Sequence, residues 1–148
     1  DIMANWLWFT KLHTKVFQLT GGRLGSNLAG IDIVFVDTIG RKTGQVRTLP
    51  IACYAYEDDL IISASNNGQD TDPVWWLNLK AQPEVEIQRG TKRYRVRAEE
   101  ITGDERAVAW QVVIKKNPVQ AHHQQKTQRL IPLVRLRKNI SVQAQNQA

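Results

Sequence analysis

The chain has 148 residues and a net charge of +6, with 42% hydrophobic and 23% charged residues, which is typical of one soluble globular domain. Its single cysteine, Cys53, excludes an intrachain disulfide and a cysteine-based zinc site, and this favours a cytoplasmic location. No hydrophobic run reaches the roughly 20 residues that span a bilayer, and the pI of about 9.7 favours anionic partners such as nucleic acid, acidic lipid or a phosphorylated small molecule.

The first predicted element is an amphipathic helix over residues 4–20, in an N-terminal segment 1–20. Apolar residues recur there at steps of three and four, from Trp6 to Leu19, which is the spacing of one helical face. Trp8, Lys11 and Lys15 share another face, and this combination suits the surface of a membrane. Peripheral membrane contact and packing on the chain's own domain both stay open for this helix.

Residues 21–140 are predicted to form one α+β domain, a split β-barrel of six antiparallel strands with peripheral helices, followed by a flexible tail over 141–148. β-branched or alternating runs predict strands, and helical patterns predict helices between them. The predicted strands are 31–38, 46–56, 60–65, 84–90, 91–101 and 130–137, and the helices are 74–81, 104–116 and 119–129.

Three local signals refine these boundaries. Pro50 lies inside the second strand and cannot donate a ladder hydrogen bond, so it indicates an edge or a bulge. Asp72 before Pro73 is predicted to be the N-cap of the helix over 74–81. Thr102 and Glu105 have the spacing of a capping box for the helix over 104–116.

A basic turn is predicted between the first two strands, in GRKTGQVRTLP (40–50). Arg41, Lys42 and Arg47 bring three cations to one bend, and the glycines at 40 and 44 allow a close approach of the backbone to a ligand. Guanidinium groups bind phosphate oxygens in a bidentate manner. The turn either grips an anion or is a solvated hairpin tip, and its own sequence leaves both open.

A second polar group follows the third strand, in SASNNGQDTDPVWWLN (63–78). Ser65 lies at the predicted strand end, and the chain then leads to a helix N-terminus, which favours anions. Trp75 and Trp76 are neighbours in the predicted helix and point about 100° apart. One ring can pack inward while the other forms a wall for a flat ligand, and core packing of both rings is the alternative.

The remaining polar residues predict neither a metal site nor a nucleic-acid interface. His122 and His123 are adjacent, and neighbours on a helix face in different directions, so a surface pair is expected instead of a chelate. Basic residues are spread over 92–97 and the last strand without the aromatic interleaving that binds bases. Cys53 lies in mid-strand and is expected to be a small core residue.

The basic turn, the segment SNNGQDTDPVWWLNLKAQPEVEIQ and the later TQRLIPLV occur in a fixed order. Together they closely resemble the deazaflavin (coenzyme F420)-dependent nitroreductase family, over about residues 20–136. The resemblance implies a split β-barrel like that of flavin-binding oxidases, with coenzyme F420 as the cofactor. It also implies transfer of a hydride from reduced F420 to a small-molecule electron acceptor: a quinone, a nitroaromatic or an activated alkene.

Carried onto this chain, the resemblance implies three groups of cofactor-binding residues. The phosphate side is Arg41, Lys42, Thr43 and Arg47. The strand along the deazaflavin ring is Thr48, Leu49, Pro50, Ile51 and Ala52. The next strand end and the helix flank are Ser63, Ala64, Ser65, Asn66, Val74, Trp75, Trp76, Leu77 and Asn78. Ser65 is also the expected catalytic donor to the oxygen that gains charge.

The chain departs from the family pattern in a stretch where relatives often carry tyrosines on the substrate side. Gln120 and His123 occupy that stretch here, so the acceptor is left open. His123 is expected either to be catalytic, as a proton donor to the reduced substrate, or to be a surface residue. The alternatives to an F420-dependent reductase are FMN as cofactor and a non-catalytic protein of the same fold that stores a flavin, deazaflavin or haem. The sequence does not predict the oligomeric state.

Overall fold

The computed structural model describes residues 30–139, so the predicted helix over 4–20 and the tail over 141–148 lie outside the described residues. Peripheral membrane contact through that helix therefore stays a prediction. The described chain forms six strands, three α-helices and one 3-10 turn, η1. Their bounds are β1 Asp32–Ile39, β2 Val46–Tyr56, β3 Asp59–Ser63, η1 Asn66–Gly68, α2 Val74–Ala81, β4 Glu84–Arg89, β5 Lys92–Ile101, α3 Gly103–Lys116, α4 Val119–Gln125 and β6 Leu133–Lys138.

The six strands close into an antiparallel barrel in the order β1-β2-β3-β6-β5-β4, which confirms the predicted fold class. Side chains alternate between the two faces of a strand, and in β1 every second residue from Val34 to Thr38 is buried. The inward residues of all six strands fill the barrel, together with Trp76 and Leu79 of α2. A second cluster, including Tyr54, Ile61 and Val113, packs α3 against the outside of β2 and β3.

β2 has two strand neighbours along only part of its length. Its pairing with β1 is unbroken from Asp32 opposite Cys53 to Ile39 opposite Val46, but its pairing with β3 covers only Cys53–Tyr56. Within residues 30–139, the stretch 46–52 therefore has one free edge. Pro50 lies on this edge without a bulge in the β1–β2 register, because a residue without an N–H is tolerated where no strand pairs.

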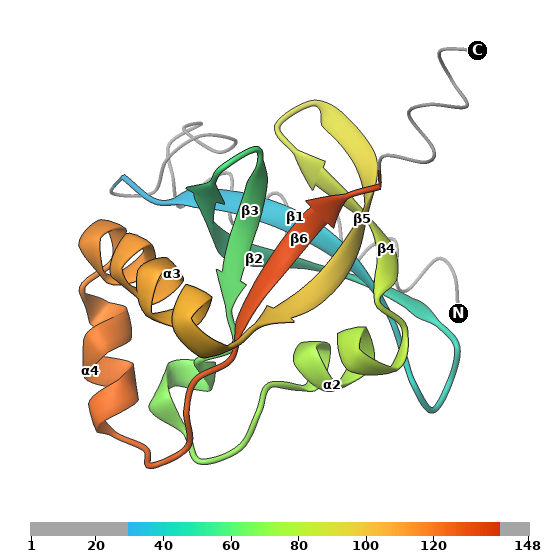
Figure 1. The fold of residues 1–148 in the computed structure, drawn as a ribbon. Helices are drawn as coiled ribbons and strands as arrows, with labels where there is room; N and C mark the ends of the chain where they lie inside the picture. Colours follow the sequence, from blue (N-terminus) through green and yellow to red (C-terminus); the bar gives the residue numbers. More distant parts are fainter. Residues whose placement is uncertain (1–29, 140–148) are drawn as a thin grey trace.

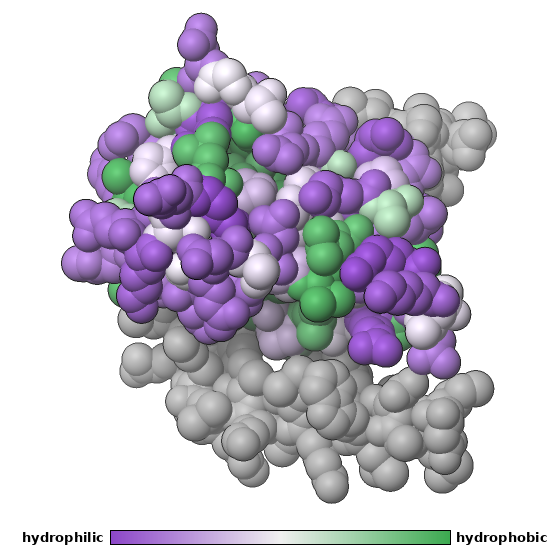
Figure 2. Space-filling view, turned by 90° about the horizontal axis from the view of Figure 1, so that it is seen from below, coloured by the Kyte–Doolittle hydropathy of each residue, from purple (hydrophilic) through white to green (hydrophobic). Residues whose placement is uncertain are grey.

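The helices lie on different sides of the barrel (Figure 1). α3 and α4 form a pair on one side, and α4 contacts η1. α2 lies below the barrel, and the β1–β2 hairpin reaches down beside it. Seen from the side of α2, most of the surface is hydrophilic, with hydrophobic side chains in separate small groups (Figure 2). This arrangement brings the basic turn of the hairpin next to α2.

Several predicted boundaries are wrong. β3 ends at Ser63, before Ser65, and α4 ends at Gln125 instead of residue 129. β6 begins only at Leu133, because residues 126–132 form a loop whose Arg129 side chain is hydrogen-bonded to the loop after β3.

One predicted helix cap is wrong, and the other is confirmed only in its position. Pro73, not Asp72, is the N-cap of α2, since the Asp72 carboxylate is paired with Arg129. Thr102 is the N-cap of α3 but its side chain makes no capping hydrogen bond. The Glu105 carboxylate is instead engaged by Tyr56 and Arg135.

Candidate functional site

A pocket of about 340 Å³ opens at the free edge of β2. Its walls come from β2, the end of β3, the η1 loop, the start of α2 and one residue of α4. The lining residues are Leu49, Pro50, Ile51, Ala52, Tyr54, Ser63, Ser65, Asn66, Asn67, Pro73, Trp75 and Gln120. Its volume is within the range of small-molecule sites in proteins, roughly 300–1,000 Å³.

The pocket faces the edge of β2, not only one of its faces, because four consecutive residues, 49–52, line it. In an antiparallel strand every second residue directs its N–H and C=O toward a given neighbour. Along 46–52 no described strand takes up the groups on the free side. The pocket wall therefore offers backbone donors and acceptors to a ligand.

The two adjacent tryptophans lie in different surroundings, which is one of the two arrangements that the sequence leaves open. Trp76 is 3% exposed and belongs to the core, with Lys80 Nζ 5.4 Å from its ring centroid. Trp75 is half-buried and lines the pocket. One ring thus stabilises the fold while the other provides an aromatic wall.

Ser65 lies in the loop between β3 and η1 and is 8% exposed. Its hydroxyl makes no hydrogen bond to any residue in the described part of the chain, and Ser65 lines the pocket. Asn66 and Asn67, which follow it, have left-handed backbones with φ of 48° and 57°. Gly68 continues this conformation, and a Cβ there would lie 2.8 Å from the carbonyl oxygen of His123. Such a run is energetically costly and persists only where its surroundings hold it.

Two hydrogen-bonded pairs involve polar residues of the pocket lining. Ser63 Oγ donates to Gln120 Oε1 at 2.8 Å, which leaves the Gln120 amide N–H groups available. Asn117 Nδ2 donates to the Tyr54 hydroxyl at 2.9 Å. Burial raises the pKa of Tyr54, against the opposing effect of the Asn117 hydrogen bond, so the phenol is protonated at neutral pH and can donate.

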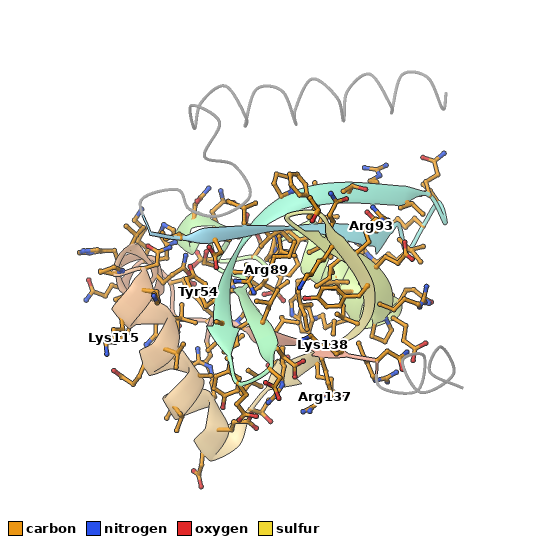
Figure 3. All side chains as sticks on the ribbon, turned by 90° about the horizontal axis from the view of Figure 1, so that it is seen from above. Tyr54, Arg89, Arg93, Lys115, Arg137 and Lys138 are labelled. Carbon is orange, nitrogen blue, oxygen red and sulfur yellow. The ribbon has the colours of Figure 1, made fainter. Side chains whose placement is uncertain are left out.

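Tyr54 and Gln120 are pocket residues that the predicted site set does not include, as are Asn67 and Pro73. The sequence could have indicated Tyr54 as a site residue, since it lies two residues after the predicted site residue Ala52 and shares its face of β2. It packs between β2 and α3 (Figure 3). Gln120 comes from α4, and nothing local in its sequence indicates that it reaches the strand residue Ser63.

The basic turn is held to α2. Arg41 donates to Asn78 Oδ1 twice, from its backbone N at 3.2 Å and from Nη1 at 3.1 Å. Within the turn, Gly44 N donates to Gly40 O, and Thr43 Oγ1 accepts a hydrogen bond from Gln45 N. Thr43 therefore shapes the turn.

Lys42 and Arg47 are exposed and have no acidic partner among residues 30–139. The turn is not part of the pocket lining, but it is close along the chain. Arg47 precedes Leu49 by two residues of β2, about 7 Å along a strand. Arg47 therefore lies just outside the pocket, and Lys42 lies further away, in the turn before β2.

The other predicted site residues have different surroundings. Thr48 donates its hydroxyl to Asp37 at 2.6 Å, Ala64 is buried in the core, and neither Val74 nor Leu77 lines the pocket. His123 also lies outside the lining. Its Nδ1 has no hydrogen-bond partner in the described chain, and burial, Lys126 and His122 lower its pKa.

Cys53 is a buried residue, as the sequence predicts, and burial raises its thiol pKa to about 12. In residues 30–139, no three His, Cys, Asp or Glu side chains are grouped to hold a metal ion. No helix in that range is long and apolar enough to cross a membrane.

A model of the F420H(2)-dependent quinone reductase family matches residues 8–138 of the sequence. The chain belongs to this family. It is 35% identical over 128 residues to the F420H(2)-dependent quinone reductase Rv1261c of Mycobacterium tuberculosis, covering 84% of this chain and 86% of that protein. This membership confirms the family resemblance and gives coenzyme F420 as the cofactor.

Solved structures agree with this assignment. The structure of an F420-H2 dependent reductase, FDR-A, is 34% identical, with a TM-score of 0.66 over 71% of this chain and 93% of that chain. A haem-binding protein of Mycobacterium smegmatis has a TM-score of 0.55 at 15% identity, which shows a shared fold alone. The comparisons therefore support an oxidoreductase over the non-catalytic storage protein.

Proposed function

We propose that this chain binds reduced coenzyme F420 across the pocket and the basic turn and reduces a quinone. The observation that carries the proposal is the continuity of the two: β2 lines the pocket with residues 49–52, carries the exposed Arg47 and begins at the basic turn, where Lys42 lies. Bound F420H2 supplies the hydride, and the protein supplies position and charge stabilisation.

The described residues fit the chemistry of this cofactor. A deazaflavin ring is flat and carries amide-like N–H and C=O groups on one edge. The free backbone groups of β2 match that edge, and Trp75 offers an aromatic face. Lys42 and Arg47 match the phosphate and the glutamate tail, since exposed cations near a pocket attract an anionic ligand.

We assign the acceptor side of the pocket to Ser65, Tyr54 and Gln120. Each has a hydrogen-bond donor that the described structure does not use. A quinone oxygen gains negative charge as the ring is reduced, and preorganised donors stabilise such an oxygen. Tyr54 and Gln120 thereby take the place of the tyrosines that this chain lacks in the stretch around 120–123.

The test is to titrate the protein with oxidised and reduced F420 beside FMN, and then to follow oxidation of bound F420H2 by menadione. We expect F420 to bind more tightly than FMN and menadione to be reduced. Ser65→Ala is expected to lower kcat by about 100-fold, as loss of one oxyanion donor does, with F420 affinity retained. Thr91→Ala, which removes an exposed hydroxyl from the β4–β5 turn, is the control. Tight binding of F420 without oxidation by any quinone would support the storage protein instead.

A further inference from the structure

The loop that carries Ser65 is held by one side chain from a distant part of the sequence. Arg129, in the loop between α4 and β6, reaches across to residues 64–72. Its Nη2 donates to the carbonyl oxygens of Ala64 at 3.1 Å and Ser65 at 2.8 Å. Its Nε donates to Gln69 O at 2.8 Å, and its Nη1 to Asp72 Oδ1 at 3.0 Å. Four acceptors along the loop thus share one guanidinium group.

The guanidinium is suited to this task in a way that no other side chain is. Its donors form a rigid planar fork, whereas the ammonium of lysine is a compact point charge. The Arg129 side chain is 16% exposed and is ion-paired with Asp72. Its charge is therefore balanced within the loop, and three of its four hydrogen bonds are partly buried.

The segment around Arg129 is fixed as well. Thr127 Oγ1 donates to Asp70 Oδ1 at 2.8 Å and accepts from Arg129 N at 3.3 Å. Gln124 Nε2 donates to Arg129 O at 2.8 Å. A rigid support is needed, because residues 64–72 contain two asparagines in the left-handed conformation. The backbone strain of these asparagines would be relieved if the loop were free to change conformation.

We propose that Arg129 is a positioning residue for the reduction: it fixes the Ser65 carbonyl and thereby aims the Ser65 hydroxyl into the pocket. Arg129 does not itself line the pocket. The inference rests on the proposed role of Ser65 as a donor to the acceptor oxygen. It predicts an effect on kcat and not on the affinity for F420, because the residues proposed to bind the phosphate, Lys42 and Arg47, lie in and after the turn that follows β1.

Arg129→Lys and Arg129→Ala test the proposal. Both are expected to lower kcat by about 100-fold, the cost of a displacement of about 1 Å at a reacting centre, while the Kd for F420 is retained. Added guanidinium ion is expected to restore kcat to Arg129→Ala but not to Arg129→Lys, whose ammonium occupies the site. Arg135→Lys is the control, because Arg135 is also largely buried but pairs with Glu57, Asp59 and Glu105, away from residues 64–72.

A kcat unchanged in both Arg129 variants would overturn the proposal. So would rescue by guanidinium of thermal stability without rescue of kcat, since that result assigns Arg129 to stability alone. Amide hydrogen exchange in residues 64–72 separates this inference from the proposed function. Faster exchange there in Arg129→Lys, but not in Arg135→Lys, supports the role of Arg129 in holding this loop, even if the wild-type protein reduces no quinone. Equal exchange in Arg129→Lys and wild type contradicts that role.

Discussion

Arg41 is joined to Asn78, 37 residues further along the chain, by two hydrogen bonds to one side-chain oxygen. One bond uses the backbone of the turn and the other uses the guanidinium group. Asn78 is 4% exposed and lies one helical turn after Trp75 in α2. The basic turn and the aromatic wall of the pocket are therefore parts of one rigid arrangement.

Substitution of Asn78 separates the mechanical and the electrostatic contributions of this link. Asn78→Ala removes both bonds and is expected to lower the free energy of unfolding by about 1–3 kcal/mol and to weaken F420 binding. Asn78→Asp keeps the acceptor but places a negative charge beside Arg41, so F420 affinity is expected to fall while thermal stability is retained. Gln111→Glu, an exposed position on α3, controls for net charge. Equal F420 affinity in Asn78→Asp and wild type would show that Arg41 faces no anion.

The charge of Lys42 is expected to act on cofactor binding and not on folding, because the side chain is exposed and unpaired among residues 30–139. Lys42→Ala is expected to raise the Kd for F420 by about tenfold at low salt, the order expected for a charge-assisted contact. The difference from wild type should shrink at 1 M salt, where the Debye length is about 3 Å. Lys115→Ala makes the same change of charge on the outer side of α3 (Figure 3) and is expected to leave the Kd unchanged. A salt-independent loss of affinity would point to misfolding of the turn.

His123 is expected to make the protein less stable in acid. Burial, Lys126 and His122 lower its pKa from the ordinary value of 6.5, so below pH 6.5 the unfolded chain binds a proton more readily than the folded one. The free energy of unfolding therefore falls as the pH drops through this range. His123→Asn is expected to flatten the dependence in urea titrations between neutral and mildly acidic pH. His122→Asn, which removes an exposed imidazole, is expected to keep most of the pH dependence. Identical pH profiles for wild type and His123→Asn would show that His123 is not its source.

Cys53 is expected to be unreactive in the folded protein. Burial raises the pKa of its thiol from 9.0 to about 12, and the thiolate is the reactive form. A disulfide reagent at pH 8 is expected to label Cys53 only as fast as the chain unfolds. Above pH 9.0 the unfolded thiol ionises first, so the free energy of unfolding decreases with rising pH, and Cys53→Ala is expected to remove this component. Fast labelling under native conditions would show that the barrel opens at β2.

Local sequence predicted the barrel well because its strands are β-branched runs bounded by turn residues. The limits of β2, 46–56, are predicted correctly, and Pro50 correctly indicates an edge. The errors concern residues whose partners are far away in sequence. Asp72 has the pattern of an N-cap, but its carboxylate is paired with Arg129, 57 residues later, and no local pattern contains that information.

The site was predicted in part for the same reason. Leu49–Ala52, Ser65 and Trp75 line the pocket as expected, since they are fixed by the strand and helix that carry them. In α4, Gln120 and His123 are three residues apart, and only His123 is a predicted site residue. Gln120 reaches the pocket, where it is bonded to Ser63 at the end of β3. That contact depends on how α4 packs, which the local sequence does not reveal.

The half-paired stretch of β2 also bears on how the protein avoids self-association. An open strand edge is a template on which a strand of another molecule can pair, and proline is one device that blocks such pairing. Pro50 interrupts the row of donors near the middle of 46–52. A ligand seated along the same edge covers the groups that Pro50 leaves. Binding of reduced F420 in the pocket is thus expected to suppress aggregation as well as to provide the hydride.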